Sequence, residues 1–542
     1  MPIDEFLDLN KAYGRVQQDK RDDSWPDIIN YRDYECILQE NLTTLHAKIA
    51  SPNTYQTKPS SNIDIPKKGF TLRPVAVPVI DDRIVYQAIA DYLSPHFQPE
   101  LCVYSNILSK DINSSRMFIP GVESWIEFQQ AIEKLCNSFS WVVETDISAY
   151  FECIDHYRLL HRIHDIFANK VDADALRESK QLLQRLWGRW SKGKKIGIPQ
   201  VNDASSFFAN VYLDELDKWM IRQGYVFLRY VDDMRIFTNS EPSARFALAE
   251  LITQLREIGL HVGAGKTFIK DTADVMRELQ DNAERMDNIE AEIKSGDPAR
   301  LEAAVTMLER FITELISDPK KFNDRPFRFC VNRFKRLKVN NLAIESHEGI
   351  ANAVLERLTT MPYETGTFVD YLSLFPESEG VQRKVIEFLE GAYNIYPWQE
   401  MLLLELLIRL NIVPELKDRA LSIVRIIARN DYKHPACREK AFIFWGKNGD
   451  YADRREIRGR YHDEPREDVR RAILFAIQDM QAGERNNFLN SVVNDSVAIR
   501  MTALYIEKLE RPTYHFYNPP AGFDIAENWD SNDIDDLPMP SP

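Results

Sequence analysis

The pattern of apolar and polar residues divides the chain into three regions. From 276 to 511, apolar residues recur at i, i+3 and i+4 with charged faces between them, which predicts helices almost throughout. Residues 512–542 contain six acidic residues and no Lys or Arg, so we expect an irregular acidic tail. Residues 1–275 mix helical stretches with short β-rich runs, which are Pro74–Ile80, Trp141–Val143, Tyr225–Tyr230 and Met234–Phe237.

The helical part contains a weak internal period of 31 residues. Ala441, Ala472 and Ala503 each end a similar four-residue string, and an apolar residue follows each of them. Stacked helix pairs need a small side chain where neighbouring helices cross. The period therefore indicates a HEAT-like repeat. A helical domain without a repeat is the alternative, because Ala is common in helices.

Composition and charge narrow the class of protein. The 542 residues suffice for two to four domains, and 44% hydrophobic with 28% charged residues is a globular composition. A net charge of −15 argues against a protein that coats duplex DNA or anionic lipid with its whole surface. The six cysteines form no Cys-x-x-Cys pair, so no zinc finger is indicated. The most apolar run, Met401–Val413, is too short to cross a membrane, and we expect a soluble cytoplasmic protein.

Three aspartates lie where short apolar strands end. Asp146 directly follows an apolar run, and Asp232 and Asp233 separate two β-rich runs, which predicts a tight hairpin turn. Clustered carboxylates repel each other unless a cation binds them. Mg²⁺ prefers oxygen ligands and bridges carboxylates to phosphates, and two such ions can catalyse an in-line displacement at a phosphate. The three aspartates therefore predict a site for two Mg²⁺ ions, with Mn²⁺ as a substitute.

The order of these motifs resembles that of bacterial reverse transcriptases. The matching segments are Arg73–Pro78 and Asp82–Ala88 for the fingers, Asp146–Phe151, Gly197–Gln200 with Ser205–Leu216, Tyr230–Asp233, and Gly259–Leu260 with Gly265–Thr267. The resemblance implies an α+β fold of fingers and palm with an N-terminal arm over residues 1–275. An all-α HEAT-like repeat domain over 276–511 and the acidic tail over 512–542 would follow.

The resemblance also implies roles for the residues around the metals. Asp146, Asp232 and Asp233 would hold the two ions, with the backbone carbonyl of Ile147 as a further ligand. Phe151 would lie under the sugar and exclude a ribose 2′-hydroxyl, although a core aromatic is the simpler interpretation and both can hold.

Four further residues are expected at the nucleotide by the same resemblance. Arg73 would bind the triphosphate, since a guanidinium makes bidentate contacts with phosphate oxygens. Arg83 has the same expected role, with an ordinary solvated or salt-bridged arginine as an equal alternative. Gln200 would line the nucleotide pocket. Lys266 would approach the leaving pyrophosphate, with an ordinary surface lysine as its alternative.

One segment departs from the family pattern. Members of the family usually have Pro-Gln-Gly where this chain has Pro199-Gln200-Val201-Asn202-Asp203. Glycine would let the backbone approach a template or nucleotide closely. A β-branched residue and an added acid at this place put ordinary template copying in doubt.

Two basic clusters predict a path for nucleic acid. One spans 185–195, contains Lys192, Lys194 and Lys195, and includes two tryptophans, Trp187 and Trp190. The other spans 320–338, contains Arg333, Lys335 and Arg336, and includes four phenylalanines, which are Phe322, Phe327, Phe329 and Phe334. Positive charge and stacking aromatics suit a single strand. The alternative for each cluster is an amphipathic helix with a solvated basic face.

The architecture resembles the phage-defence reverse transcriptases, that is, abortive-infection polymerases and related enzymes. That resemblance implies dNTP substrates, a homo-oligomer, and template-independent synthesis of single-stranded DNA primed by a protein hydroxyl. The candidate primers in the N-terminal arm are Tyr13, Tyr31, Tyr34 and Tyr55. Two alternatives stay open: templated cDNA synthesis on a dedicated non-coding RNA, and a pseudo-polymerase whose helical repeats bind a partner protein.

Overall fold

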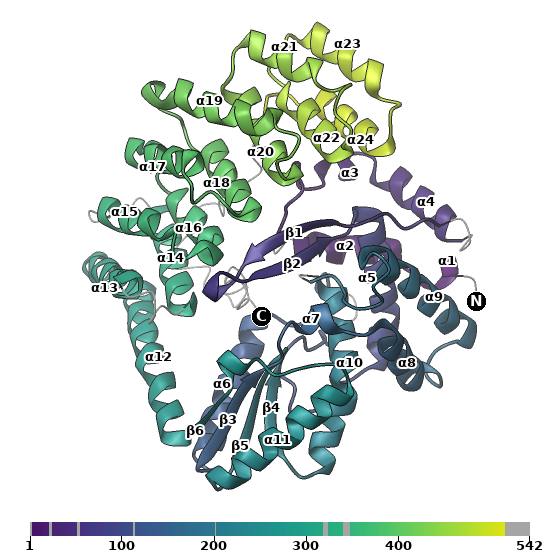
Figure 1. The fold of residues 1–542 in the computed structure, drawn as a ribbon, viewed down its shortest axis with the longest axis vertical. Helices are drawn as coiled ribbons and strands as arrows, with labels where there is room; N and C mark the ends of the chain where they lie inside the picture. The colour runs from purple at the N-terminus through teal and green to yellow at the C-terminus, as the bar shows by residue number, and fades with distance from the viewer. Residues whose placement is uncertain are drawn as a thin grey trace.

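The computed structural model describes residues 3–20, 24–50, 55–111, 114–200, 202–317, 324–339 and 347–514. Within these ranges the chain folds into an α+β region followed by a largely helical region (Figure 1). Most of the expected acidic tail lies outside the described residues. In the described part of the chain no helix is long and apolar enough to cross a membrane.

A four-stranded antiparallel sheet forms the palm. Its strands are β3 (Trp141–Asp146), β4 (Val226–Tyr230), β5 (Asp233–Thr238) and β6 (Phe268–Asp271), in the order β4-β5-β3-β6. Helices α10 (Asp203–Arg222) and α11 (Glu241–Glu257) pack on one face, and α6 (Gly121–Cys136) packs on the other. The β-rich runs predicted around Trp141, Tyr225 and Met234 are confirmed as strands.

The fingers are a two-stranded hairpin and the helix after it. Strand β1 (Ser61–Pro66) pairs antiparallel with β2 (Leu72–Val77), and α5 (Ile80–Leu93) follows. The strand expected at 74–80 instead begins at Leu72 and ends at Val77. It ends before Pro78 because proline has no N–H to donate to a ladder. The N-terminal arm contains α1 (Ile3–Phe6), α2 (Leu9–Asp19), α3 (Arg32–Glu35) and α4 (Leu38–Ile49). Between β3 and α10 lie α7 (Tyr150–Cys153), α8 (His156–Phe167) and α9 (Ala173–Trp190).

The helical prediction for 276–511 is confirmed in the described residues. The first helix, α12 (Thr272–Lys294), begins directly after β6, so the boundary expected at 275 lies inside a helix. The other helices are α13 (Pro298–Ser317), α14 (Asp324–Val339), α15 (His347–Arg357), α16 (Thr365–Leu372), α17 (Glu379–Glu390), α18 (Pro397–Arg409), α19 (Pro414–Arg429), α20 (Pro435–Asn448), α21 (Tyr451–Gly459), α22 (Glu467–Ala476), α23 (Ala482–Val492) and α24 (Val497–Glu507).

These helices pack in two rows. Helices α14, α16, α18, α20, α22 and α24 contact one another in succession, as do α13, α15, α17 and α19. Ala441, Ala472 and Ala503 lie on α20, α22 and α24 and are all buried. At Gly446 the backbones of α20 and α22 come so close that an added Cβ would overlap the carbonyl of Ala476. A HEAT-like repeat stays a prediction.

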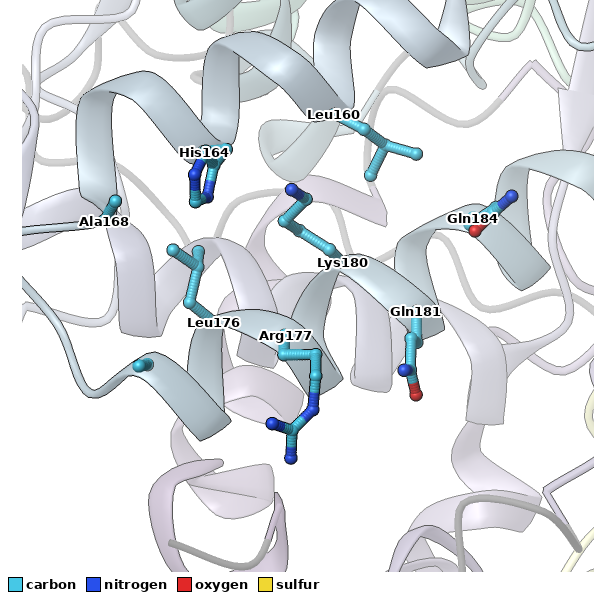
Figure 2. A pocket seen from close by; sticks show the side chains of 9 residues that line it. Leu160, His164, Ala168, Leu176, Arg177, Lys180, Gln181 and Gln184 are labelled. Carbon is cyan, nitrogen blue, oxygen red and sulfur yellow. The ribbon is translucent and has the colours of Figure 1, made fainter.

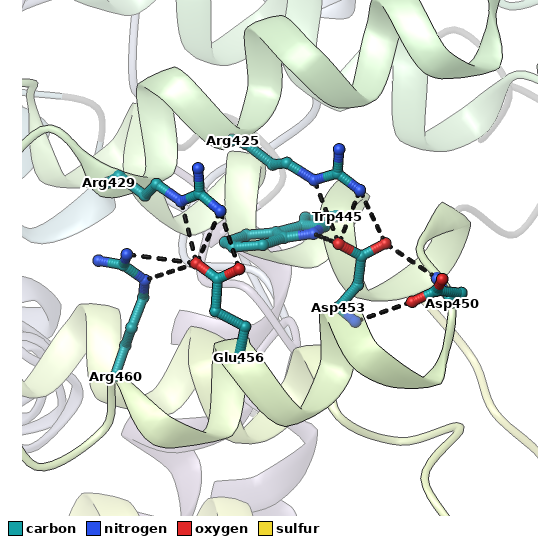
Figure 3. Close-up of polar contacts among 7 residues, drawn as sticks. All are labelled: Arg425, Arg429, Trp445, Asp450, Asp453, Glu456 and Arg460. Atoms are coloured by element: carbon teal, nitrogen blue, oxygen red, sulfur yellow. Dashed lines mark hydrogen bonds and ion pairs between the residues drawn. The ribbon is translucent and has the colours of Figure 1, made fainter.

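Ion pairs tie the outer helices together around a buried tryptophan. Arg425 of α19 donates two hydrogen bonds to one carboxylate oxygen of Asp453 on α21, at 3.1 and 2.7 Å (Figure 3). Arg429 binds Glu456 in the same way, one turn further along both helices. The indole N–H of Trp445 donates to Asp453 (2.7 Å), so the core residue and the surface pair share one acceptor. Partial burial makes such shared pairs stronger than isolated surface pairs.

The helical region arches from the palm to the N-terminal arm (Figure 1). Helix α12 packs on α6 and β6, whereas α24 packs on α3. Arg471 of α22 pairs with Asp27 (2.6 Å) and Asp33 (2.7 Å) of the arm. Ile63 and Val75 of the fingers hairpin belong to the same hydrophobic core as the helices. The fingers are therefore packed into the helical region as well as joined to the palm.

We expect Gly446→Ala to destabilise the fold by about 1–3 kcal/mol, because the added methyl group forces α20 and α22 apart. Urea unfolding followed by circular dichroism measures this effect. Gly459→Ala is the matched control: it lies in α21 with nothing within 4 Å of the added Cβ, and it should be neutral or slightly stabilising. Equal effects of the two substitutions would show that the close helix crossing is wrong.

Candidate active site

Strand pairing brings the predicted aspartates to one edge of the palm sheet. Asp146 ends β3 and stands directly opposite Asp233, the first residue of β5. Asp232 lies in the two-residue turn between β4 and β5, and its carbonyl accepts the N–H of Ile147 (3.0 Å). Successive side chains of a strand point to opposite faces, so residues 142, 144 and 146 share one face of the sheet. The chain thus holds three carboxylates in a short arc.

The turn that carries Asp232 has a strained backbone. Val231 has φ of 54°, a left-handed conformation that is costly for a β-branched residue. Its N–H donates to the hydroxyl of Ser105 (2.6 Å), and its carbonyl accepts from the Arg229 guanidinium (2.9 Å). These two bonds hold the turn against its strain and so fix the position of Asp232.

A buried ion pair anchors the hairpin to helix α10. Arg229 makes two hydrogen bonds to Asp217, at 2.9 and 2.6 Å, and both side chains are almost fully buried. Arg229 also donates to the side-chain oxygen of Asn210 (3.1 Å), and the amide of Asn210 donates to the carbonyl of Ser105 (3.2 Å). The same network therefore supports both bonds that restrain Val231.

The segment after α11 closes the site over Asp146. Gly263 donates its N–H to the carbonyl of Asp146 (2.8 Å), and a Cβ at Gly263 would overlap the carboxylate of Asp146. Only glycine permits this approach. Lys266 then places its ammonium 2.9 Å from the other carboxylate oxygen of Asp146. The structure thus brings Lys266 to Asp146, and its expected approach to the leaving pyrophosphate stays a prediction.

Crowding of the carboxylates changes their protonation. Burial, followed by the charge of Asp233, raises the pKa of Asp232 from its ordinary value of 3.8 to about 7. Burial also raises the pKa of Asp233, which Arg235 and Lys266 oppose. Burial alone would lower the pKa of Lys266, but its hydrogen bond to Asp146 and the nearby carboxylates raise it. The site favours positive charge.

The donor set fits divalent cations in its chemistry. Within the described residues, Oδ1 of Asp146 is buried without a hydrogen-bond partner, and hard oxygen donors of this kind suit Mg²⁺. No three His, Cys, Asp or Glu side chains in the described ranges already stand in a geometry that could hold a metal ion. Since Lys266 pairs with Asp146, the carboxylates would have to turn toward one another and away from Lys266 to enclose an ion. Ile147 is buried beside them and forms an antiparallel bridge with Val262. The two hydrogen bonds of that bridge are made by the neighbouring residues Asp146 and Ser148, so they do not use the carbonyl of Ile147.

The expected nucleotide residues surround the same edge. Phe151 is buried in α7, and its carbonyl accepts the N–H of Ile198 (3.0 Å), which aligns the segment before Gln200 with α7. Gln200 is buried and hydrogen-bonds Glu152. Burial lowers the pKa of Arg73, while Asp232 and Glu152 oppose this effect electrostatically. Arg73 of the fingers and Asp232 of the palm therefore face a common space.

Sequence reasoning missed several members of the site. Lys67 interacts electrostatically with Arg73, Glu152 and Asp232, and Ser105 restrains the turn that carries Asp232. Arg229 directly precedes the Tyr-Val-Asp-Asp segment and lies in the apolar run of a predicted strand. A buried charge needs a partner, so this position was a signal for a buried ion pair. Lys67 and Ser105 carry no local pattern that would have identified them.

Arg83 does not take the nucleotide-binding place expected of it. Its side chain is buried and paired with Asp19, whose second oxygen accepts the N–H of Asp203 (3.1 Å). The salt-bridge alternative therefore describes Arg83 in this structure: it supports the start of α10. Asp203 is the first residue of that helix, and Val201 lies outside the described residues.

The stacking role predicted for the aromatic residues of the basic clusters is corrected. Trp187, Trp190, Phe327, Phe329 and Phe334 are all buried in hydrophobic cores, so their rings are not available to bases. They line the apolar faces of α9 and α14, because each cluster is an amphipathic helix.

The two clusters differ in the exposure of their charges. Arg333 is buried and pairs with Glu290 (3.1 Å), so its predicted place on the nucleic-acid path is wrong. Phe322 and the side chains of Lys335 and Arg336 lie outside the described residues. Lys192, Lys194 and Lys195 are exposed in the turn after α9. This turn leads directly to Gln200, and the role of these three lysines on a nucleic-acid path stays a prediction.

The four candidate priming tyrosines are buried. Tyr34 donates its hydroxyl to Asp81 (3.0 Å), and Tyr55 donates to Asp82. Burial and these carboxylates raise the pKa of both phenols, and burial with Glu35 raises that of Tyr13. A phenol with a raised pKa is a poor nucleophile at neutral pH. In this conformation neither these tyrosines nor the buried Tyr31 can prime synthesis.

A cavity of about 340 Å³ lies apart from the aspartates, between α8 and α9. His164, Leu176 and Lys180 line it, together with three apolar residues and three polar or charged ones (Figure 2). None of the residues predicted from the sequence for catalysis or nucleotide binding lines this cavity. The candidate site is therefore the open sheet edge.

Comparisons with known proteins agree with this location. Residues 65–279 match the family described as reverse transcriptase (RNA-dependent DNA polymerase). The chain is 25% identical over 211 residues to protein YkfC of Escherichia coli (strain K12), and this match covers 36% of this chain and 49% of YkfC. It is 27% identical over 171 residues to the group II intron-encoded protein LtrA of Lactococcus lactis subsp. cremoris, and this match covers 31% of this chain and 26% of LtrA. The chain thus spans at most about half the length of these relatives.

A solved structure of apo telomerase from Candida tropicalis is also similar to this chain. It has 13% sequence identity and a TM-score of 0.31, and the match covers 66% of this chain and 70% of that one.

We expect Asp217→Asn to destabilise the protein by about 3–5 kcal/mol, because Arg229 would keep a buried charge with no compensating carboxylate. Glu241→Gln is the control, since it breaks the exposed pair with Arg245 and should cost well under 1 kcal/mol. Chemical unfolding of both variants measures the difference. If Asp217→Asn were as mild as the control, Arg229 would not anchor the hairpin.

Asp232→Asn should change how stability depends on pH. The raised pKa means that ionisation of Asp232 opposes folding, so the wild type loses stability relative to the variant as pH rises from about 4 to about 7. The relative gain for the variant at pH 8 is at most about 4 kcal/mol. Unfolding in EDTA at several pH values measures it. Asp463→Asn, at an exposed position of the helical region, is the control for the loss of a carboxylate outside the cluster. A pH-independent difference for Asp232→Asn would contradict the crowding of the carboxylates.

Proposed function

We propose, from the reverse transcriptase family to which residues 65–279 belong, that the chain is a polymerase that joins deoxynucleotides. The observation that carries the proposal is the register of the palm sheet, which sets Asp146 opposite Asp233 and next to Asp232. Among the described residues, the three aspartates of the matched motifs meet only at this edge of the sheet.

Asp146, Asp232 and Asp233, with the carbonyl of Ile147, would hold two Mg²⁺ ions, and Mn²⁺ would serve in their place. When bound, such ions lower the pKa of an attacking hydroxyl and neutralise the leaving pyrophosphate. The protein contributes the geometry: the Arg229 network fixes Asp232, and Gly263 lets Lys266 approach Asp146. Lys266 pairs with Asp146 until a cation takes its place and would then be free to bind phosphate.

The surrounding residues would select and hold the nucleotide. Arg73 and Lys67 come from the fingers and face Asp232, which suits a triphosphate that bridges fingers and palm. Gln200 and Phe151 come from the opposite side. The buried ring of Phe151 would lie under the sugar and exclude a 2′-hydroxyl, which favours dNTPs over rNTPs. Lys192, Lys194 and Lys195 would guide a single strand past Gln200.

We further propose that synthesis needs no external template. The support is the segment after Gln200, where Asp203 begins α10 and adds negative charge beside the proposed nucleotide pocket. A protein hydroxyl other than those of the four buried tyrosines would then start the single-stranded DNA. Templated copying of a non-coding RNA is the alternative, supported by the family description itself.

Other expectations rest on the resemblance to phage-defence enzymes and stay predictions. These are the defence role, the homo-oligomer and the HEAT-like repeat, for which the two rows of helices and the three buried alanines are the support. The pseudo-polymerase alternative predicts a protein without nucleotide incorporation.

Purified protein should incorporate labelled dNTPs in Mg²⁺, and Asp233→Asn should reduce this activity by about 100-fold or more, because a charged ligand is lost. Asp463→Asn is the matched control and should keep full activity. The reactions use each dNTP alone and all four together, with and without nuclease pre-treatment. Incorporation by Asp233→Asn within a few-fold of wild type would contradict the assignment.

The product of the same reactions distinguishes the two modes of synthesis. If synthesis is template-independent and protein-primed, it persists after nuclease pre-treatment of the enzyme, and the DNA product shifts on denaturing gels after protease digestion. Free DNA that matches a co-purified RNA would instead establish templated copying.

A further inference from the structure

The start of helix α20 binds the first strand of the fingers through one histidine. His434 immediately precedes α20, and its Nδ1 accepts the N–H of Ala436 (3.3 Å). A neutral imidazole that accepts at Nδ1 carries its proton on Nε2. Nε2 lies 2.9 Å from the carbonyl oxygen of Asn62 in β1, so His434 donates a hydrogen bond to the fingers strand.

The surroundings of His434 fix the ring in this state. Burial lowers the pKa of His434, which keeps the imidazole neutral near pH 7. The indole ring of Trp25 packs edge-on against it, with 5.0 Å between ring centroids. Trp25 is itself held, because its indole N–H donates to Glu439 of α20 (3.1 Å). Helix α20 therefore orients His434 both directly and through Trp25.

The strand that His434 holds leads to the proposed triphosphate site. In the β1–β2 ladder, Asn62 pairs with Ala76 and Ile65 pairs with Arg73. Ile63 and Val75 lie between these two pairs, and both are buried in the core shared with the helical region. A displacement of β1 at Asn62 is thus transmitted along a short, packed ladder to Arg73, which interacts with Asp232.

We infer that His434 is a positioning residue for nucleotide binding. It ties β1 to α20 and thereby sets the distance between Arg73 of the fingers and the aspartates of the palm. This inference deepens the proposed function and rests on it. The helical region then contributes to nucleotide affinity from outside the nucleotide site, through a hydrogen bond to the backbone of the fingers.

The ion pairs between the helical region and the N-terminal arm provide a contrast. Arg500 of α24 pairs with Glu40 of α4 (2.7 Å), and both side chains are exposed. This pair also anchors the helical region to the N-terminal half of the chain, but through α4 of the arm and not through the β1–β2 hairpin. Loss of Arg500 therefore tests for a general loosening of the helical region, whereas loss of His434 tests the fingers.

His434→Asn is the variant that separates the two contacts of the histidine. Asparagine is a good N-cap, so it keeps an acceptor for the N–H of Ala436 and preserves the start of α20. Its shorter side chain ends before the position of Nε2 and loses the bond to Asn62. Arg500→Gln is the matched control.

Two measurements on the full chain test the inference. Hydrogen exchange followed by mass spectrometry reports the protection of residues 61–77, and steady-state incorporation reports KM and kcat for a dNTP. In His434→Asn we expect exchange in the hairpin, and KM, each to rise about three- to tenfold, the equivalent of one hydrogen bond, with kcat changed by less than about twofold. In Arg500→Gln both should stay at the wild-type values.

The possible outcomes are distinguishable. Unchanged exchange in the hairpin of His434→Asn overturns the bond to β1. Faster exchange with an unchanged KM, or an equal change in Arg500→Gln, overturns the positioning role. If wild-type protein incorporates no nucleotide, the proposed function fails, and hydrogen exchange alone decides whether His434 holds the strand.

Discussion

Electrostatic repulsion at one sheet edge is the constraint on which the rest of the palm depends. The register of β3 and β5 places Asp146 opposite Asp233, and the turn adds Asp232 beside them. Their repulsion and burial oppose folding, as the raised pKa of Asp232 indicates. The surrounding structure offsets this cost with the Arg229–Asp217 pair behind the turn and Lys266 in front of it. In the proposed function, bound cations would relieve this repulsion.

The same constraint explains why the fingers need support. In the proposed function, Arg73 and Lys67 would hold a triphosphate at a fixed distance from the aspartates, and a two-stranded hairpin is only marginally stable alone. Here the hairpin shares a core with the helical region through Ile63 and Val75. The arch of helices therefore packs against both the palm and the fingers, between which the proposed nucleotide would bind.

Sequence patterns predicted the parts of the structure that local rules determine. The apolar runs before Asp146 and around Asp232 identified the strands, and the hairpin predicted the pairing of β4 with β5, whereas the pairing of β3 with β5 is seen only in the structure. The helical half followed from its periodicity. Arg83, Arg333 and the aromatic residues of the basic clusters were harder, because charge and ring type do not reveal which face of a helix is buried. Long-range partners decided those cases, as with Asp19 for Arg83 and Glu290 for Arg333.

Binding of Mn²⁺ measured by electron paramagnetic resonance, in the presence of a dNTP, tests the central claim most directly. If the three aspartates form a two-metal centre, wild-type protein binds about two ions per chain, and Asp146→Asn binds at most about one. Equal stoichiometry and equal affinity in the two proteins would contradict the account.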